Sequence, residues 1–178
     1  TATKTAIWFV SSASGAVSFS DFTATSGHNA IVFGSLQAPL TMTNVVSAAS
    51  TNGNGFVAFG VTTAATTISI SGGSFTGVDC GILFPALTAS TTVTLSGVAA
   101  ESTGSTELTD QALRFVGAVA GPVIIKGGTF TQTVGTTVAI RFHSTVTGAV
   151  SMSDMTAKSP NTAIYFFDLR APLAMTNV

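Results

Sequence analysis

The first and last segments of the chain repeat each other. Residues 5–45 align without a gap with residues 138–178, and 24 of the 41 paired residues are identical. Residues 5–137 are therefore one complete copy of a 133-residue repeat, and residues 138–178 begin the next. Repetition of this kind predicts a modular fold in which each unit stacks on its neighbour. We expect residues 1–178 to form a single segment of a longer tandem array.

A shorter repeat of about 25 residues divides the long one. Its first phrase is a small residue, an apolar residue, a variable residue and Phe, as in AIVF at residues 30–33. In the third unit we read Val57 as the apolar residue, Ala58 as the variable one and Phe59 as the Phe, with Phe56 in the small position. The step from Ile7 to Ile140 equals the long period and contains five of the shorter units. The apolar residues of the successive phrases are Ile7, Ile31, Val57, Ile82, Leu113, Ile140 and Ile164.

The second phrase alternates apolar and polar residues and ends on a turn residue, as in VSFSD at residues 17–21. Alternation with a period of two predicts short strands. The turn slot holds Asp, Asn or Gly, which tolerate a left-handed backbone. Its clearest members are Asp21, Asn44, Gly97, Asp154 and Asn177.

An apolar residue after the turn opens a third strand, with Phe75 and Phe130 among these residues. A unit this short cannot bury its apolar face alone, so it must stack on identical neighbours. The sequence therefore predicts an all-β chain: a parallel β-helix, or β-solenoid, of about seven coils with three short strands in each.

The coil length and the turn slot resemble the right-handed parallel β-helix of the pectin-lyase-like superfamily. The resemblance is architectural and covers the whole chain, and large tandem-repeat surface and fibre proteins look similar. For enzymes of the superfamily it implies clustered Asp, Lys and Arg on one outer face, often with calcium.

The charged residues of this chain are too few and too scattered to predict such a cluster. They make up 7% of the chain, with a net charge of −1, which argues against nucleic-acid binding. Glu101, Glu107 and Asp110 fall in one long unit, where we interpret them as solvated loop charges; a weak cation site or an acid pair is the alternative. Arg114 and Arg141 share an outward slot, as an exposed pair or as a joint site for an anionic partner.

No catalytic, cofactor or metal motif is recognisable, so we expect a protein that is not an enzyme and has no cofactor. The single cysteine, Cys80, excludes an internal disulfide and is expected to be a small buried or turn residue. No apolar run is long enough to predict a membrane span.

Stacked coils place two sets of side chains in outward columns, and both are candidate interaction surfaces. The variable residues of the first phrase form a mostly apolar column, which marks an interaction surface unless a loop covers it. This column is Trp8, Val32, Ala58, Leu83, Arg114, Arg141 and Tyr165. The polar residues of the second phrase form two hydroxyl ladders, interrupted by Ile124 and Lys126. The ladder residues are Ser18, Ser20, Thr41, Thr43, Ser69, Ser71, Thr94, Ser96, Ser151 and Ser153.

These features favour a structural or adhesive protein, outside the cell or on its surface, that forms part of a long rod or filament. Its expected partner is itself, through continuation of the chain, end-to-end stacking or lateral contact. One alternative is a carbohydrate-binding or polysaccharide-processing β-helix. Another is an ice-binding protein, because regular hydroxyl arrays on flat solenoid faces resemble those of ice-binding proteins.

Overall fold

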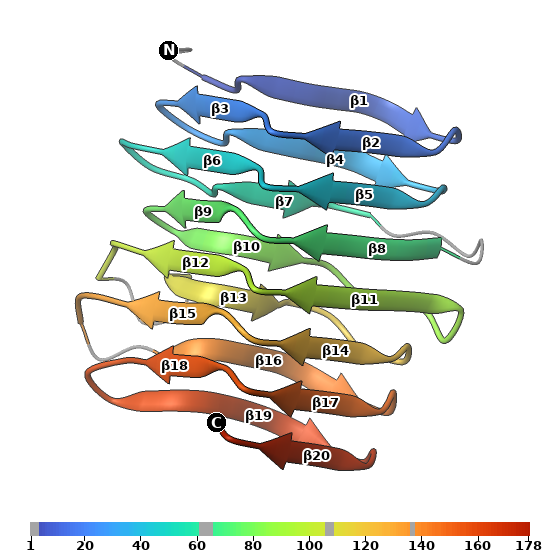
Figure 1. The fold of residues 1–178 in the computed structure, drawn as a ribbon, viewed down its shortest axis with the longest axis vertical. Coiled ribbons are helices and arrows are strands. Elements are labelled where there is room, and N and C mark those ends of the chain that lie inside the picture. Colours follow the sequence, from blue (N-terminus) through green and yellow to red (C-terminus); the bar gives the residue numbers. More distant parts are fainter. Residues whose placement is uncertain (1–3, 61–65, 106–108, 136–137) are drawn as a thin grey trace.

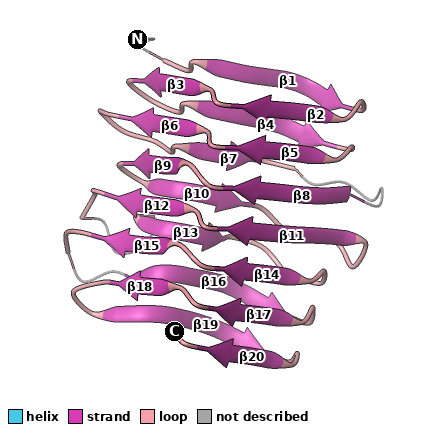
Figure 2. Ribbon diagram, viewed as in Figure 1, coloured by secondary structure: helices cyan, strands magenta, loops and turns pink. Residues whose placement is uncertain are grey.

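The computed structural model describes residues 4–60, 66–105, 109–135 and 138–178. In this part of the chain all regular structure is β-strand, wound into a parallel β-solenoid with three sheets (Figures 1 and 2). Each coil contributes one strand to each sheet. Six coils have all three strands, and two strands of a further coil follow them. The prediction of a parallel β-solenoid with three strands per coil is confirmed.

Strands that open the coils form the first sheet: β1 (Ile7–Ala13), β4 (Ile31–Leu36), β7 (Phe56–Ala58), β10 (Cys80–Phe84), β13 (Gln111–Phe115), β16 (Val138–Val146) and β19 (Thr162–Leu169). The second sheet holds β2 (Val17–Ser20), β5 (Leu40–Thr43), β8 (Thr66–Ser71), β11 (Thr91–Ser96), β14 (Val123–Lys126), β17 (Val150–Ser153) and β20 (Leu173–Thr176). The third holds β3 (Thr23–Ser26), β6 (Val46–Ala49), β9 (Ser74–Gly77), β12 (Ala99–Ser102), β15 (Thr129–Gln132) and β18 (Thr156–Lys158).

The coils are right-handed. The strands of the first sheet run behind those of the other two sheets and in the opposite direction, and the chain advances one level per coil (Figure 1). This is the hand that parallel strands joined by crossover connections adopt almost without exception.

The bend between the second and third sheets depends on the turn slot. Asp21, Asn44, Asp154 and Asn177 have φ values of 49°, 53°, 52° and 53°. Glycines fill the slot in the remaining coils, at Gly72, Gly97 and Gly127, and their φ values are also positive. The left-handed backbone predicted for this slot is therefore present in every coil.

Side chains in the turn slot also connect neighbouring coils. Asn44 Nδ2 donates to Asp21 Oδ1 over 3.2 Å, and Asn177 Nδ2 donates to Asp154 Oδ1 over 2.8 Å. The second pair is the first one displaced by one long repeat, so the repeat reproduces this contact between coils.

Phenylalanine rings stack along the inside of the first sheet. Ring centroids lie 4.6 Å apart for Phe115 and Phe142 and again for Phe142 and Phe166, with nearly parallel planes. Phe9 and Phe33 stack in the same way at 4.5 Å. Stacked rings repeat at the spacing of the coils, so one slot supplies a continuous apolar column.

The predicted register of the third coil is wrong by one residue. Phe56 pairs with Ile31 and Ile82, so it fills the inward apolar slot. Val57 then occupies the outward slot. Ala58 takes the slot of the stacked Phe rings and is fully buried, so it does not belong to the outward column.

The slot for a small residue, directly before the inward apolar residue, explains this register. Gly55 fills it, and an added Cβ there would lie 2.8 Å from the carbonyl oxygen of Gly81 and 3.0 Å from the amide nitrogen of Thr76. Phe56 is too large for so close an approach of two backbones. Phe59, predicted to be inward, is 59% exposed.

The corner after the turn slot accommodates large side chains in two ways. In the fourth coil Val98 fills the corner and the small Ala100 follows two residues later. In the fifth coil Gly128 stands at the corner, and Phe130, which pairs with Ala100, supplies the bulk. The third coil repeats this exchange with Gly73 and Phe75. Phe75 and Phe130 thus lie inside the third strand, two residues beyond the predicted position.

Buried polar side chains line the corner where the third sheet leads into the next coil. Ser26, Ser102 and Gln132, the last residues of their strands, are buried there. Ser102 Oγ donates to the carbonyl of Val78 over 2.9 Å, and Gln132 Nε2 donates to that of Gly104 over 2.7 Å. Through these bonds the buried side-chain donors find partners among the loop carbonyls.

Replacing Gly128 with Ala should destabilise the protein by at least about 2 kcal/mol, because a left-handed backbone disfavours a side chain. The new Cβ would also lie 2.2 Å from the carbonyl oxygen of Val98. Urea unfolding followed by circular dichroism measures the change. The matched control is Gly97→Asn, which puts the residue found at position 44 into an open turn slot. Equal losses in the two variants would contradict this account of the corner.

Candidate interaction faces

The outward column of the first sheet is only partly exposed. Register places Trp8, Val32, Val57, Leu83, Arg114, Arg141 and Tyr165 in it, with Val57 replacing Ala58. Trp8 is 60% exposed and Tyr165 38%, but Val32 and Val57 are buried. The continuous exposed column that the sequence predicts is therefore interrupted in the second and third coils.

A second outward column runs beside the first, one residue after the slot of the stacked Phe rings. Its exposed members include Val10, Phe59, Val116 and Phe167. The sequence reasoning did not include this column, although the same period of two that identifies the first column would have found it. We call the two columns together the first-sheet face.

A hollow of about 410 Å³ lies on the first-sheet face. Its lining is mostly apolar, with one guanidinium group. The lining residues are Phe59, Leu83, Pro85, Ala86, Arg114, Val116 and Gly117.

Two arginines give the same face a local positive charge. Arg114 and Arg141 are neighbours in register on β13 and β16. Arg114 Nη1 donates to the carbonyl of Thr109 over 3.4 Å, and the Arg141 guanidinium lies 5.3 Å from the ring centroid of Tyr165, a cation–π contact. Burial lowers the pKa of His143 below its usual value, and the charges of Arg141 and Arg114 lower it further. His143 is therefore neutral near pH 7.

Irregular pairing also marks this sheet, and it recurs with the long repeat. The register shifts between Phe9 and Ser12 in β1 and, one long repeat later, between Phe142 and Thr145 in β16. Beside the second shift, Asp168 Oδ2 accepts hydrogen bonds from Thr145 Oγ1 (3.1 Å) and Arg170 Nε (2.9 Å). The bond from Arg170 is the main cause that lowers the pKa of Asp168.

The hydroxyl ladders lie on the second sheet, as predicted. Each ladder residue pairs in register with its counterpart in the next coil, with no register shift from β2 to β20. All of them are exposed or half-buried. Ile124 and Lys126 interrupt the ladders on β14, and both are exposed. We call this surface the hydroxyl face.

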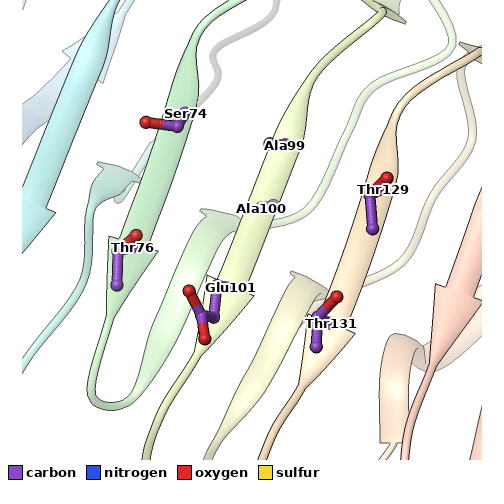
Figure 3. A pocket seen from close by; sticks show the side chains of 7 residues that line it. All are labelled: Ser74, Thr76, Ala99, Ala100, Glu101, Thr129 and Thr131. Atoms are coloured by element: carbon purple, nitrogen blue, oxygen red, sulfur yellow. The ribbon is translucent and has the colours of Figure 1, made fainter.

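A shallow hollow of about 180 Å³ lies on the outer face of the third sheet (Figure 3). Ala99 forms part of its lining, between Ser74 and Thr129 on the neighbouring strands. The Glu101 carboxylate stands between Thr76 and Thr131 in the same way. The hollow thus presents one carboxylate among hydroxyl groups.

Two of the three acids of the long fourth coil are not the solvated loop charges that the sequence predicts. Glu101 is a half-buried residue of β12. Asp110 is buried and accepts a hydrogen bond from Thr109 Oγ1 over 2.6 Å. Glu107 lies outside the described residues. Within the described ranges, no three His, Cys, Asp or Glu side chains gather where they could hold a metal ion.

Cys80 is a buried residue at the start of β10, as predicted. Its Sγ donates to the carbonyl of Thr109 over 3.0 Å. Burial raises the pKa of the thiol from 9.0 to about 12, against smaller opposing effects of the Gln111 backbone and the Arg114 charge. The thiol is therefore protonated and enclosed at neutral pH.

No protein-family model, curated protein or solved structure matches this chain. Among the described residues there is no helix of the length and hydropathy needed to cross a membrane.

Stability should fall as the pH rises from 9 towards 12, because in that range the Cys80 thiol ionises in the unfolded chain and stays protonated in the folded one. Urea unfolding at pH 8 and at pH 10.5 measures this, with Cys80→Ala as the control that removes the titrating group. A thiol reagent at pH 8 should leave the folded protein unmodified and react once with the unfolded chain. An equal loss of stability in Cys80→Ala would show that another group is responsible.

Proposed function

We propose that this chain is a segment of a structural or adhesive rod, outside the cell or on its surface, and that it is not an enzyme. The observation that carries the proposal is that the long repeat equals a whole number of coils. Ile7 and Ile140 occupy the same slot of the first sheet, five coils apart. Copies of the repeat therefore join in phase, without a gap or an extra strand.

Details of the coils recur with the same period. The register shift in β1 returns in β16, and the pair Asp21–Asn44 returns as Asp154–Asn177. A repeat that restores both the pairing and the turn contacts supports a solenoid extended by further coils of the same kind.

The edge of a solenoid, such as β20, is a surface on which a further coil can stack. Leu173 and Met175 are 38% and 45% exposed, whereas Leu40 and Met42, in the same slots of an inner coil, are fully buried. A further coil on β20 would bury this apolar surface, which stabilises by about 25 cal/mol per Å². Continuation of the chain and end-to-end contact with another copy would both supply such a coil.

The dispersal of the acidic side chains supports a role without catalysis. Asp21 and Asp154 serve in turns, Asp168 pairs with Arg170, and Asp110 is buried. These carboxylates belong to the scaffold, whereas glycoside hydrolysis typically needs two carboxyl groups facing one glycosidic bond.

Adding one 133-residue unit should lengthen the particle by about 24 Å, five coils at about 4.8 Å each, without changing its cross-section. Small-angle X-ray scattering of the 178-residue chain and of a chain extended by residues 46–178 measures both quantities. The control is an extension with the same residues in shuffled order, which should add disorder and not a defined length. A compact particle of the extended chain would contradict the rod.

A second candidate function, carbohydrate binding, is favoured by the hollow beside Glu101. A carboxylate among hydroxyls offers acceptors and donors for sugar hydroxyl groups. If this is correct, Glu101→Gln should weaken binding to a neutral polysaccharide at least tenfold in titration calorimetry. Lys158→Gln, a change in the same outward row of the third sheet, should leave binding unchanged. Equal binding by the wild type and Glu101→Gln would reject this site.

A further inference from the structure

We propose that the hydroxyl face of the second sheet is the surface through which two copies of this chain associate side by side. The inference deepens the proposed rod and rests on it, because it names the face at which neighbouring rods meet.

The long repeat preserves the hydroxyl face and changes the first-sheet face. Three of the four ladder residues in β2 and β5 recur unchanged in β17 and β20, and the fourth, Thr41, becomes the smaller Ala174. All four outward residues of the corresponding first-sheet coils are replaced: Trp8, Val10, Val32 and Gly34 become Arg141, His143, Tyr165 and Phe167. A contact that repeats along two rods needs a surface with the period of the rods. The hydroxyl face meets this requirement.

The hydroxyl face is also the regular one. Its register is unbroken from β2 to β20, whereas the first sheet has shifts in β1 and β16. Its rungs repeat at about 4.8 Å, and the two ladders stand about 6.7 Å apart along the strands. A second copy has the same spacings, so the hydroxyls of the two faces can match in the successive coils on either side of β14, which carries Ile124 and Lys126 in their place. This argument favours a second copy over an unrelated partner.

The ladder hydroxyls are free to make such contacts. In the ranges that the structure describes, none of them hydrogen-bonds to another group of the chain. A hydroxyl both donates and accepts, so two identical faces are complementary to each other. Lys126 is the single charged side chain in the ladder rows of the described residues, and small side chains allow two flat sheets to approach closely.

The size of the face determines how strongly two copies bind. Seven strands of about four residues cover about 450 Å² on each copy, or about 900 Å² in a pair. This lies below the roughly 1,200 Å² of a stable complex, so a single segment should dimerise weakly. Each further repeat adds about 300 Å² per copy, so association should strengthen with the length of the rod.

Sedimentation equilibrium of the 178-residue chain up to about 1 mM tests the proposal. The wild type should form a reversible dimer. Ser69→Glu with Thr94→Glu, which puts like charges at the centre of the face, should weaken dimerisation at least tenfold, and added salt should restore part of it. The matched control is Trp8→Arg with Val10→His, two exposed positions of the first-sheet face that receive the residues found one long repeat later, Arg141 and His143, and it should leave the dimer unchanged.

Several results would overturn the proposal: a wild type that stays monomeric at 1 mM, a glutamate variant that dimerises normally, or a control that abolishes the dimer. Circular dichroism checks that each variant is folded. If the double glutamate variant does not fold, the single variant Ser151→Glu on β17 replaces it. An extended chain that lengthens by about 24 Å and stays monomeric would refute only the lateral contact. An extended chain that does not lengthen would refute the rod itself.

Discussion

The structure depends on hydrogen bonding between identical positions of successive coils. Every strand of the three sheets pairs in parallel with the strand one coil away, so the backbone itself fixes a spacing of about 4.8 Å along the axis. Each side chain then meets its own counterpart above and below. This geometry favours side chains that can stack on an identical side chain in the next coil, such as the rings of Phe115, Phe142 and Phe166. It also concentrates any like charges that fall in one row, such as Arg114 and Arg141.

The core tolerates substitution when the total volume of a coil is kept. Val98 with Ala100 and Gly128 with Phe130 fill the same corner with opposite orders of large and small residues. Phe56 and Ala58 make the same kind of exchange on the first sheet. Cores accept such changes when volume is conserved, since packing density decides their cost. In this fold the exchange restricts the corner to glycine, because Gly128 adopts a left-handed conformation that few other residues accept.

Most of the fold follows from the sequence because two strong local signals repeat. The period of two assigns inward and outward positions, and the turn slot accepts few residue types, which is why the ladders and Asp21, Asn44, Asp154 and Asn177 are placed correctly. Two strand registers, one residue apart, fit the sequence of the third coil. Only the close backbone approach at Gly55 selects between them. The burial of Val32, Val57 and Asp110 depends on how the coils pack in three dimensions, which a repeating pattern does not encode. For the same reason, the hollow beside Glu101 could not be foreseen.

The whole number of coils in the long repeat has a consequence for how such a gene can change. Unequal recombination between the stretches that encode residues 5–45 and 138–178 would delete or insert exchangeable blocks of five coils. Because both stretches occupy the same phase of the solenoid, the joined product would keep its core, its turn slots and its hydroxyl rows continuous across the junction. Length is therefore a trait that this architecture can vary in a single genetic event, without passing through a misfolded intermediate sequence.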